Sequence, residues 1–293
     1  MSIDQHEEPQ LSLISQKLTR ILQSYSDKKL FITQGFICRN AFGEIDNLKR
    51  GGSDFTASLI GVALNAKEVI IWTDIDGFHD NDPRFVEKTH AIAELSFDEA
   101  AELAYFGAKI LHPSTIQPAK VAGIPVIIKN TMAPDALGST ISDKATGSGV
   151  KAIAAKDGIT AVRVKSGRML LAYGFMRKVF EIFELYKTPI DMITTSEISV
   201  SLTIDDLTHL TQIVDDLRHY GTVELDHEQT IISAVGEGIA SELNTAAGLF
   251  KAIDRIPVRM ISYGGSQNNI SILIPSAFKK QALNALSNHF FNH

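Results

Sequence analysis

Short apolar runs alternate with amphipathic stretches in the first half of the chain. Apolar residues recur at helical spacing in 11–24 and 55–64, and Ser96 and Glu99 form a capping box at the start of a helix that runs to Gly107. A further helix is predicted at 115–121, and short buried strands are predicted at 30–33, 68–72 and 124–128. Strands that alternate with helices predict an α/β unit around a mostly parallel sheet.

The second half of the chain has a different rhythm. Residues 134–149 are rich in Gly and Ser and are predicted to be a linker, so we place a domain boundary there and divide the chain into 1–145 and 146–293. Two similar successions of strands and helices follow, which predicts a duplicated module. The strands are predicted at 159–164, 169–172, 190–193, 199–204, 230–235, 258–262 and 270–274, and the helices at 175–186, 205–219, 239–252 and 276–288.

Composition and charge exclude several classes of protein. A net charge of −6, with no basic run, argues against a general nucleic-acid-binding protein. The single cysteine, Cys38, excludes a disulfide framework and fits a reducing compartment. No apolar stretch is long enough to span a bilayer, and the acidic N-terminus lacks a signal-peptide core, so we expect a cytoplasmic protein without a membrane partner.

The segment Lys49–Asp54 is the first candidate for chemistry. It combines two cationic side chains, two glycines, a hydroxyl and a carboxylate directly before an apolar helical run. A helix start offers unpaired N–H groups to an anion, and Arg50 has the fork geometry for a carboxylate or phosphate. Asp54 has the charge to hold an ammonium group. The alternative interpretation is an ordinary Gly-Gly turn with Ser53 as the helix N-cap.

Three further stretches carry candidate binding residues. Thr73 and Asp74 follow a predicted strand and have hard oxygens for a nucleotide or its magnesium, but they are equally typical of turn-capping residues. Arg84 and Lys109 have the charge for phosphate, although each also fits a solvated or helix-capping role. Asp191 and the run 194–197 form a polar segment that suits an ammonium group or a plain strand end. No His/Cys cluster has metal-ligand spacing, so no protein-bound metal site is predicted.

Taken together, these stretches resemble the aspartate kinases. The motifs that carry the resemblance are Gln34-Gly35-Phe36, Arg50-Gly51-Gly52-Ser53-Asp54, Trp72-Thr73-Asp74, Asp82-Pro83-Arg84 and the run from Phe106 to Pro113. The second half, with Gly174-Phe175 and the run Ile193–Glu197, resembles the paired ACT regulatory domains of the lysine-sensitive, monofunctional type. The resemblance implies the C-terminal part of an amino-acid-kinase fold, followed by two ferredoxin-like (βαββαβ) ACT domains. The first ACT unit is expected at about 166–235 and the second at about 150–165 plus 236–293.

The resemblance also implies a reaction and a set of site residues. ATP, with Mg²⁺, would phosphorylate L-aspartate to 4-phospho-L-aspartate, the first step toward lysine, threonine and methionine. Arg50 and Asp54 would bind aspartate, and Arg84 and Lys109 would act in catalysis. The implied nucleotide site consists of Thr73, Asp74, His79, Arg84, Lys109 and Ile110. The implied effector site, for lysine or else threonine, consists of Met169, Phe175, Met176, Ile190, Asp191, Ser196 and Glu197, and pairing of ACT domains would give a homodimer.

The sequence departs from the family pattern in three places. His79 stands where a tyrosine is usual near the adenine, and Ala172 stands where a serine is usual in the lysine site. The Lys-Phe-Gly-Gly-Thr type of motif, which supplies a catalytic lysine and a phosphate loop, does not occur in these 293 residues. We therefore expect a chain that lacks the N-terminal part of the kinase domain and that is weakly active or inactive alone.

Two other functions are compatible with parts of the sequence. One is a non-catalytic, amino-acid-binding regulatory chain that partners a full-length kinase. The retained Arg50, Asp54, Thr73, Asp74 and Lys109 favour descent from a working active site instead. The other is a different amino-acid kinase, for glutamate or uridylate, and the ACT pair argues against it.

Overall fold

The computed structural model describes residues 1–6, 8–49, 51–107, 111–143, 147–167 and 173–291. These residues form two compact units. The first contains residues 1–83 and 88–152, and the second contains residues 84–87 and 153–293. The predicted boundary at 145/146 and the predicted division of 146–293 into two ACT units stay predictions.

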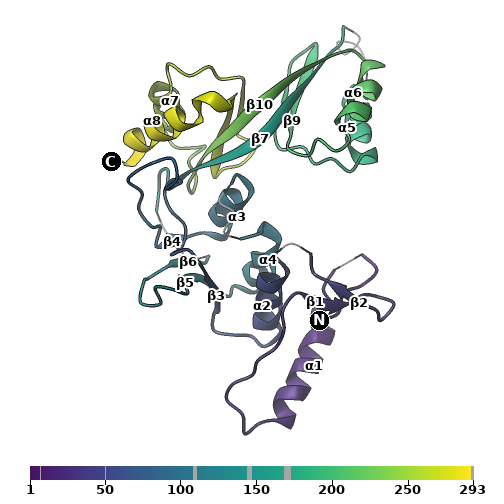
Figure 1. Cartoon of the computed structure of the whole chain (residues 1–293), viewed down its shortest axis with the longest axis vertical. Coiled ribbons are helices and arrows are strands. Elements are labelled where there is room, and N and C mark those ends of the chain that lie inside the picture. The colour runs from purple at the N-terminus through teal and green to yellow at the C-terminus, as the bar shows by residue number, and fades with distance from the viewer. Residues whose placement is uncertain (7, 50, 108–110, 144–146, 168–172, 292–293) are drawn as a thin grey trace. The chain divides into compact units, whose positions relative to one another are not determined.

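The first unit is an α/β unit around a four-stranded sheet (Figure 1). The strand order is β3-β5-β6-β4, and two of its three pairings are parallel, while β5 and β6 are antiparallel. A separate hairpin joins β1 and β2. The elements are α1 (Leu11–Ser24), β1 (Ile37–Arg39), β2 (Ile45–Asn47), α2 (Gly52–Ala63), β3 (Val69–Thr73), β4 (Glu94–Leu95), α3 (Phe97–Tyr105), α4 (Pro113–Ala122), β5 (Val126–Asn130) and β6 (Ser139–Ile141).

The capping box of α3 is confirmed. The Ser96 hydroxyl accepts from the Glu99 amide at 3.1 Å, and the Glu99 carboxylate accepts from the Ser96 amide at 2.7 Å. The Glu99 side chain is fully buried and also pairs with Lys151 at 2.9 Å. The cap therefore fixes the start of α3 and, through Lys151, the segment that precedes the next strand.

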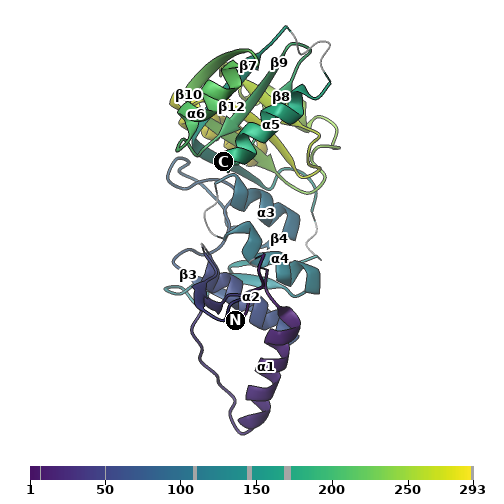
Figure 2. The ribbon, with the colours of Figure 1, turned by 90° about the vertical axis from the view of Figure 1, so that its right-hand side faces the viewer.

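One predicted strand of the first unit is wrong. Residues 30–33 form no strand, and Leu30 and Ile32 are 79% and 92% exposed. Figure 2 shows this segment within a long loop that leaves the end of α1. An apolar run forms a strand only where a neighbouring strand satisfies its backbone, and none of the strands in the described residues pairs with this one.

Three local predictions in the first unit also need correction. Helix α2 begins at Gly52 with Gly51 as N-cap, so Ser53 lies inside the helix rather than capping it. Strand β2 forms in a segment where no strand was predicted, and β6 forms in the segment predicted to be a linker. Each of these short strands is specified by its partner, β1 or β5, rather than by its own sequence.

The second unit is built on one six-stranded sheet of order β11-β12-β10-β7-β9-β8. Figure 1 shows the two long strands β7 and β10 with α7 and α8 toward one end and α5 and α6 toward the other. The elements are β7 (Ala152–Lys165), α5 (Phe175–Leu185), β8 (Ile193–Thr195), β9 (Ser199–Ile204), α6 (Leu210–Arg218), β10 (Thr222–Val235), α7 (Thr245–Ala252), β11 (Met260–Tyr263), β12 (Asn269–Pro275), the 3₁₀ turn η2 (Ser276–Phe278) and α8 (Lys279–Phe291).

The second unit keeps the predicted order of elements but changes their lengths. Strand β10 begins at Thr222 rather than at 230, and α7 begins at Thr245 rather than at 239. Residues 160–165 of β7 pair with β9, whereas the sequence placed all of 150–165 with the second ACT unit. The predicted strand at 169–172 lies outside the described residues. Among the helices described, none has the length and apolar character needed to cross a bilayer.

Candidate active site

Three motifs that lie far apart in the sequence meet at the N-terminus of α2. A side chain at Gly35 would lie 3.2 Å from the Ser53 Cα, and the Phe36 amide donates to the Thr56 hydroxyl at 3.0 Å. On the other side, a side chain at Gly51 would lie 2.9 Å from atoms of His112 and Thr115. The segments 34–36, 51–54 and 112–115 therefore surround one helix start, whose end of the helix dipole is positive and favours an anion.

The backbone at Gly51 requires glycine, which gives a first testable prediction. Its φ of +72° lies in the left-handed region, and a Cβ there would press on His112 and Thr115. We expect Gly51→Ala to lower the free energy of unfolding by about 1–3 kcal/mol, because strain and close contact add together. The matched control is Gly43→Ala, since Gly43 has a φ of +81° but open space around it. Equal losses in the two variants, measured by urea unfolding, would show that the contact contributes nothing.

Asp54 lies in the first turn of α2 and is half-buried. Burial raises the pKa of its carboxyl group above the ordinary value, and a hydrogen bond with Ser53 opposes that rise. A carboxylate that has lost part of its hydration gains from binding a cation, so this side chain suits an ammonium group. Arg50, predicted to bind aspartate with Asp54, and Lys109 and Ile110, predicted for the nucleotide site, lie outside the described residues.

Thr73 and Asp74 stand at the carboxyl end of β3, next to the end of β5. The Thr73 hydroxyl donates to the Asp74 carboxylate at 3.1 Å, and the Thr73 carbonyl accepts from the Thr131 amide at 2.8 Å. The Asp74 side chain stays exposed. The described residues contain no cluster of three potential metal ligands. Magnesium that enters with a nucleotide needs only one or two carboxylates, and Asp74 fits that requirement.

His79 is held by two protein partners through its ring nitrogens. Nε2 lies 2.8 Å from the Asp76 carboxylate, and Nδ1 lies 3.0 Å from the Thr89 hydroxyl. The hydrogen bond with His79 lowers the pKa of Asp76. Because both ring nitrogens have protein partners, only the ring face of His79 is left for contact with a ligand.

Ser139 is a site-supporting residue that the sequence did not reveal. Its hydroxyl accepts from the Phe78 amide at 2.8 Å and donates to the Ile92 carbonyl at 2.6 Å. Gly77 contacts the same hydroxyl so closely that no side chain would fit there. Ser139 thus fixes the loop that presents Asp76 and His79. It lies in a segment predicted to be a linker, and only the tertiary contact gives it a role.

Arg84 belongs to the second unit. Its side chain is exposed, and its guanidinium carbon lies 5.9 Å from the centre of the Phe85 ring. This contact lies within the second unit.

The residues predicted to bind an effector divide into two groups. Phe175 is buried in the core between α5, α6 and the sheet, and Met176 and Ile190 pack against that core. Glu197 is exposed, and the Ser196 hydroxyl lies 2.8 Å from that of Ser199. Met169 lies outside the described residues.

Asp191, the acidic residue of the predicted effector site, has an ammonium partner within the chain. Lys156 Nζ lies 2.6 Å from Asp191 and 2.9 Å from Asp205, and the Asp191 side chain is only 1% exposed. Asp191 therefore tethers β7 to the segment before β8. Glu197 remains as the exposed carboxylate of the predicted set.

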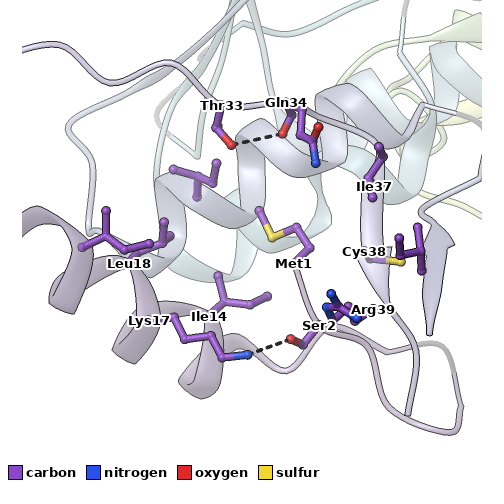
Figure 3. Close-up of a pocket in the computed structure, with 13 residues that line it drawn as sticks. Met1, Ser2, Ile14, Lys17, Leu18, Thr33, Gln34, Ile37, Cys38 and Arg39 are labelled. Atoms are coloured by element: carbon purple, nitrogen blue, oxygen red, sulfur yellow. Dashed lines mark hydrogen bonds between the residues drawn. The ribbon is translucent and has the colours of Figure 1, made fainter. Parts of the chain in front are cut away.

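A cavity of about 410 Å³ lies in the first unit beside α1 and β1 (Figure 3). Figure 3 shows Ile14 and Leu18 of α1 on one side and Ile37 and Cys38 on the other, with the Lys17 ammonium 3.5 Å from the Ser2 hydroxyl. Among the described residues, no member of the predicted aspartate, nucleotide or effector sets lines it, but Gln34 of the segment 34–36 does.

Comparisons with known proteins agree with the fold and the motifs. A model of the amino acid kinase family matches residues 2–130, and an ACT domain model matches residues 232–290. The lysine-sensitive aspartokinase 3 of Escherichia coli is 34% identical over 97% of this chain, and the chain spans 65% of that protein's length.

Two crystal structures of E. coli aspartokinase III show the same fold. The structure with aspartate and ADP superposes with a TM-score of 0.86 at 33% identity, covering 99% of this chain and 68% of that one. The structure with lysine and aspartate also gives a TM-score of 0.86, at 34% identity, covering 99% and 67%. The chain therefore belongs to the aspartokinase family, with an amino-acid-kinase domain followed by an ACT regulatory region.

Proposed function

We propose that this chain acts in the ATP-dependent phosphorylation of L-aspartate to 4-phospho-L-aspartate, under feedback control by an amino acid. The observation that carries the proposal is the meeting of three motifs at the start of α2, where Asp54 lies in the first turn of the helix. The similar E. coli enzyme was crystallised with aspartate and ADP, which supports both ligands.

Each side chain of the site has a proposed task. Arg50 holds a carboxylate of aspartate, and Asp54 holds its ammonium group. Thr73, Asp74 and the ring face of His79 receive the nucleotide, with Ile110 beside it, and Asp74 contributes an oxygen ligand to the Mg²⁺ that accompanies ATP. Arg84 and Lys109 neutralise the charge on the transferred phosphoryl group. Phosphoryl transfer of this kind depends on positioning and charge neutralisation rather than on a covalent enzyme intermediate.

Aspartate binding should depend on pH through Asp54. Burial raises the pKa of this carboxyl group above the ordinary aspartate value of 3.8, and the hydrogen bond with Ser53 opposes the rise. Binding of an ammonium group requires the ionised form, so affinity for aspartate should be constant at neutral pH and fall as pH decreases through that raised pKa. Titration of affinity between pH 7 and pH 4 measures this. An affinity loss that is the same in Asp54→Asn would assign the titration to another group.

The ACT region is proposed to bind the effector and to form a homodimer. The E. coli relative was crystallised with lysine, which favours lysine over threonine as the effector. The proposed set is Met169, Phe175, Met176, Ile190, Asp191, Ser196 and Glu197. Because Asp191 is already bound by Lys156, Glu197 is the carboxylate proposed to meet the effector's charge. A cytoplasmic location remains a prediction.

Turnover with hydroxylamine as the trapping agent tests this function. The purified chain, ATP, Mg²⁺ and L-aspartate should give aspartyl hydroxamate, and added L-lysine should suppress it. A chain that binds lysine but neither binds nor phosphorylates aspartate would instead be a non-catalytic regulatory chain.

A further inference from the structure

One carboxylate oxygen of the first unit holds both the start of α3 and the residue before β7. Glu99 Oε2 accepts from the Ser96 amide at 2.7 Å and from the Lys151 ammonium at 2.9 Å. The Glu99 side chain is fully buried, and that of Lys151 is only 13% exposed. Among the described residues, the other carboxylate oxygen, Oε1, has no hydrogen-bond partner. Lys151 is therefore the cation that compensates this buried charge.

The ion pair stands where the chain passes from the first unit to the second. The first unit ends at Ala152, directly after Lys151, and the second unit resumes at Ile153. Strand β7 contains both of these junction residues and also carries Lys156. The Lys156 ammonium lies 2.6 Å from Asp191, a member of the proposed effector set. A change at the effector set can therefore reach Lys151 along one continuous strand.

On its other side, the ion pair leads to the proposed aspartate site within the first unit. Helix α3 packs against α4, and α4 packs against α2. His112, the N-cap of α4, is so close to Gly51 that a side chain at Gly51 would lie 2.9 Å from it. Gly51 is the N-cap of α2, and the first turn of α2 carries Asp54. This contiguous packing can carry a displacement from α3 to Asp54.

We propose that the Lys151–Glu99 ion pair couples effector binding to L-aspartate binding. The pair has two states, because Lys151 either compensates the buried carboxylate or is drawn away with the start of β7. In the second state Glu99 loses its charge partner, so α3 and the helices packed on it shift. An effector that favours the second state weakens L-aspartate binding. This inference rests on the proposed function and names the contact through which its feedback operates.

The coupling is measured as the ratio of two affinities for L-aspartate, with and without saturating L-lysine, by calorimetry in the presence of ADP. We expect a ratio of at least about tenfold in the wild-type chain and of less than about threefold in Lys151→Met and in Glu99→Gln. A glutamine at this position still accepts from the Ser96 amide, so Glu99→Gln removes the charge and keeps the cap. Because coupling is reciprocal, L-aspartate should weaken L-lysine binding by the same ratio in each chain.

Three further variants separate coupling from a loss of folding. Lys151→Arg keeps a cation and should keep the wild-type ratio. Lys151→Met with Glu99→Gln leaves no buried charge unpaired, so this double variant should fold and stay uncoupled. Lys120→Met is the matched control, because it breaks the ion pair with the exposed Asp98 on the same helix, α3, and should keep the wild-type ratio. The affinity for L-lysine alone should be unchanged in all of these chains.

Hydrogen exchange tests the first step of the coupling without L-aspartate. In the wild-type chain, saturating L-lysine should change the exchange rates of the amides at the start of α3 by at least about threefold. In Lys151→Met with Glu99→Gln, L-lysine should leave those rates unchanged, because the ion pair that transmits the change is gone.

The outcomes separate this inference from the proposed function. A ratio lost in Lys151→Met, Glu99→Gln and the double variant, and kept in Lys151→Arg and Lys120→Met, supports the inference. A ratio that is unchanged in Glu99→Gln and in the double variant overturns it, and so does a ratio that is lost in Lys120→Met. A wild-type chain that binds both L-aspartate and L-lysine without any coupling overturns the inference alone. If L-lysine alters the exchange of α3 but L-aspartate does not bind, the proposed function fails and the inference fails with it.

Discussion

Replacing Lys156 with methionine is expected to lower the free energy of unfolding of the second unit by about 3–5 kcal/mol. The Lys156 ammonium lies 2.6 Å from Asp191, whose side chain is 1% exposed, and 2.9 Å from Asp205. Removing the cation takes a charge partner away from a buried carboxylate, which costs far more than the pair contributes. Chemical denaturation of the wild-type and variant chains measures the difference.

A second substitution separates the charge from the packing. In Lys156→Met with Asp191→Leu, both charges are gone, and most of the lost stability should return because an apolar pair can replace a buried ion pair. The control is Lys120→Met, because Lys120 pairs with an exposed Asp98. This substitution should lower the free energy of unfolding by less than about 1 kcal/mol. A loss below that level for Lys156→Met would mean that water reaches Asp191.

The stabilising effect of the Lys156–Asp191 ion pair should persist at alkaline pH. Burial alone would lower the pKa of the Lys156 ammonium group, but hydrogen bonds with Asp191 and Asp205 raise the pKa above the ordinary lysine value of 10.5. When the pKa of a lysine is higher in the folded chain than in the unfolded chain, the full stabilisation is present at any pH below the unfolded-state pKa. The stabilisation is lost as the pH rises through the folded-state pKa. The stability difference between wild type and Lys156→Met should therefore stay constant from pH 7 to about pH 10.

The second large effect is expected from Asp54→Asn, which should weaken L-aspartate binding by at least about tenfold. A hydrogen bond to a charged group contributes about 1.5–3 kcal/mol, and 1.4 kcal/mol corresponds to a factor of ten. The stability of the fold should stay equal or rise. The reason is that burial raises the pKa of Asp54, so its ionised form is disfavoured in the folded chain.

Asp98→Asn provides the matched control for Asp54→Asn. Asp98 also lies in the first turn of a helix, α3, but it is exposed and paired with Lys120. The variant Asp98→Asn should leave the affinity for L-aspartate unchanged. A variant Asp54→Asn that loses stability and affinity together, with Asp98→Asn unaffected, would indicate a structural rather than a ligand-binding role for Asp54.

Local chemistry was predictable from the sequence where it is self-contained. The cap at Ser96 and Glu99 and the helix at 11–24 formed as expected, because their signals lie within a few residues. The strand predicted at 30–33 is wrong, because an apolar composition does not show whether a partner strand is present. The strand β6 was missed for the opposite reason, since its partner strands β5 and β4 bring order to a Gly/Ser-rich segment.

The candidate site divides in the same way. Asp54, Thr73 and Asp74 were predicted from motifs, and the structure places Asp54 in the first turn of α2 and Thr73 and Asp74 at the end of β3. Ser139 carries no motif, because it acts through a contact with Phe78 across 61 residues of sequence. The Lys156 partner of Asp191 was missed because the sequence cannot show that the chain supplies its own ammonium group.

The most direct test of the central claim is calorimetric titration of L-aspartate into this chain in the presence of ADP. We expect saturable binding that L-asparagine does not reproduce, that weakens in Asp54→Asn and that is unchanged in Asp98→Asn. A folded chain that responds thermally to L-lysine but gives no heat with L-aspartate would contradict the account and would leave an effector-binding chain without an aspartate site.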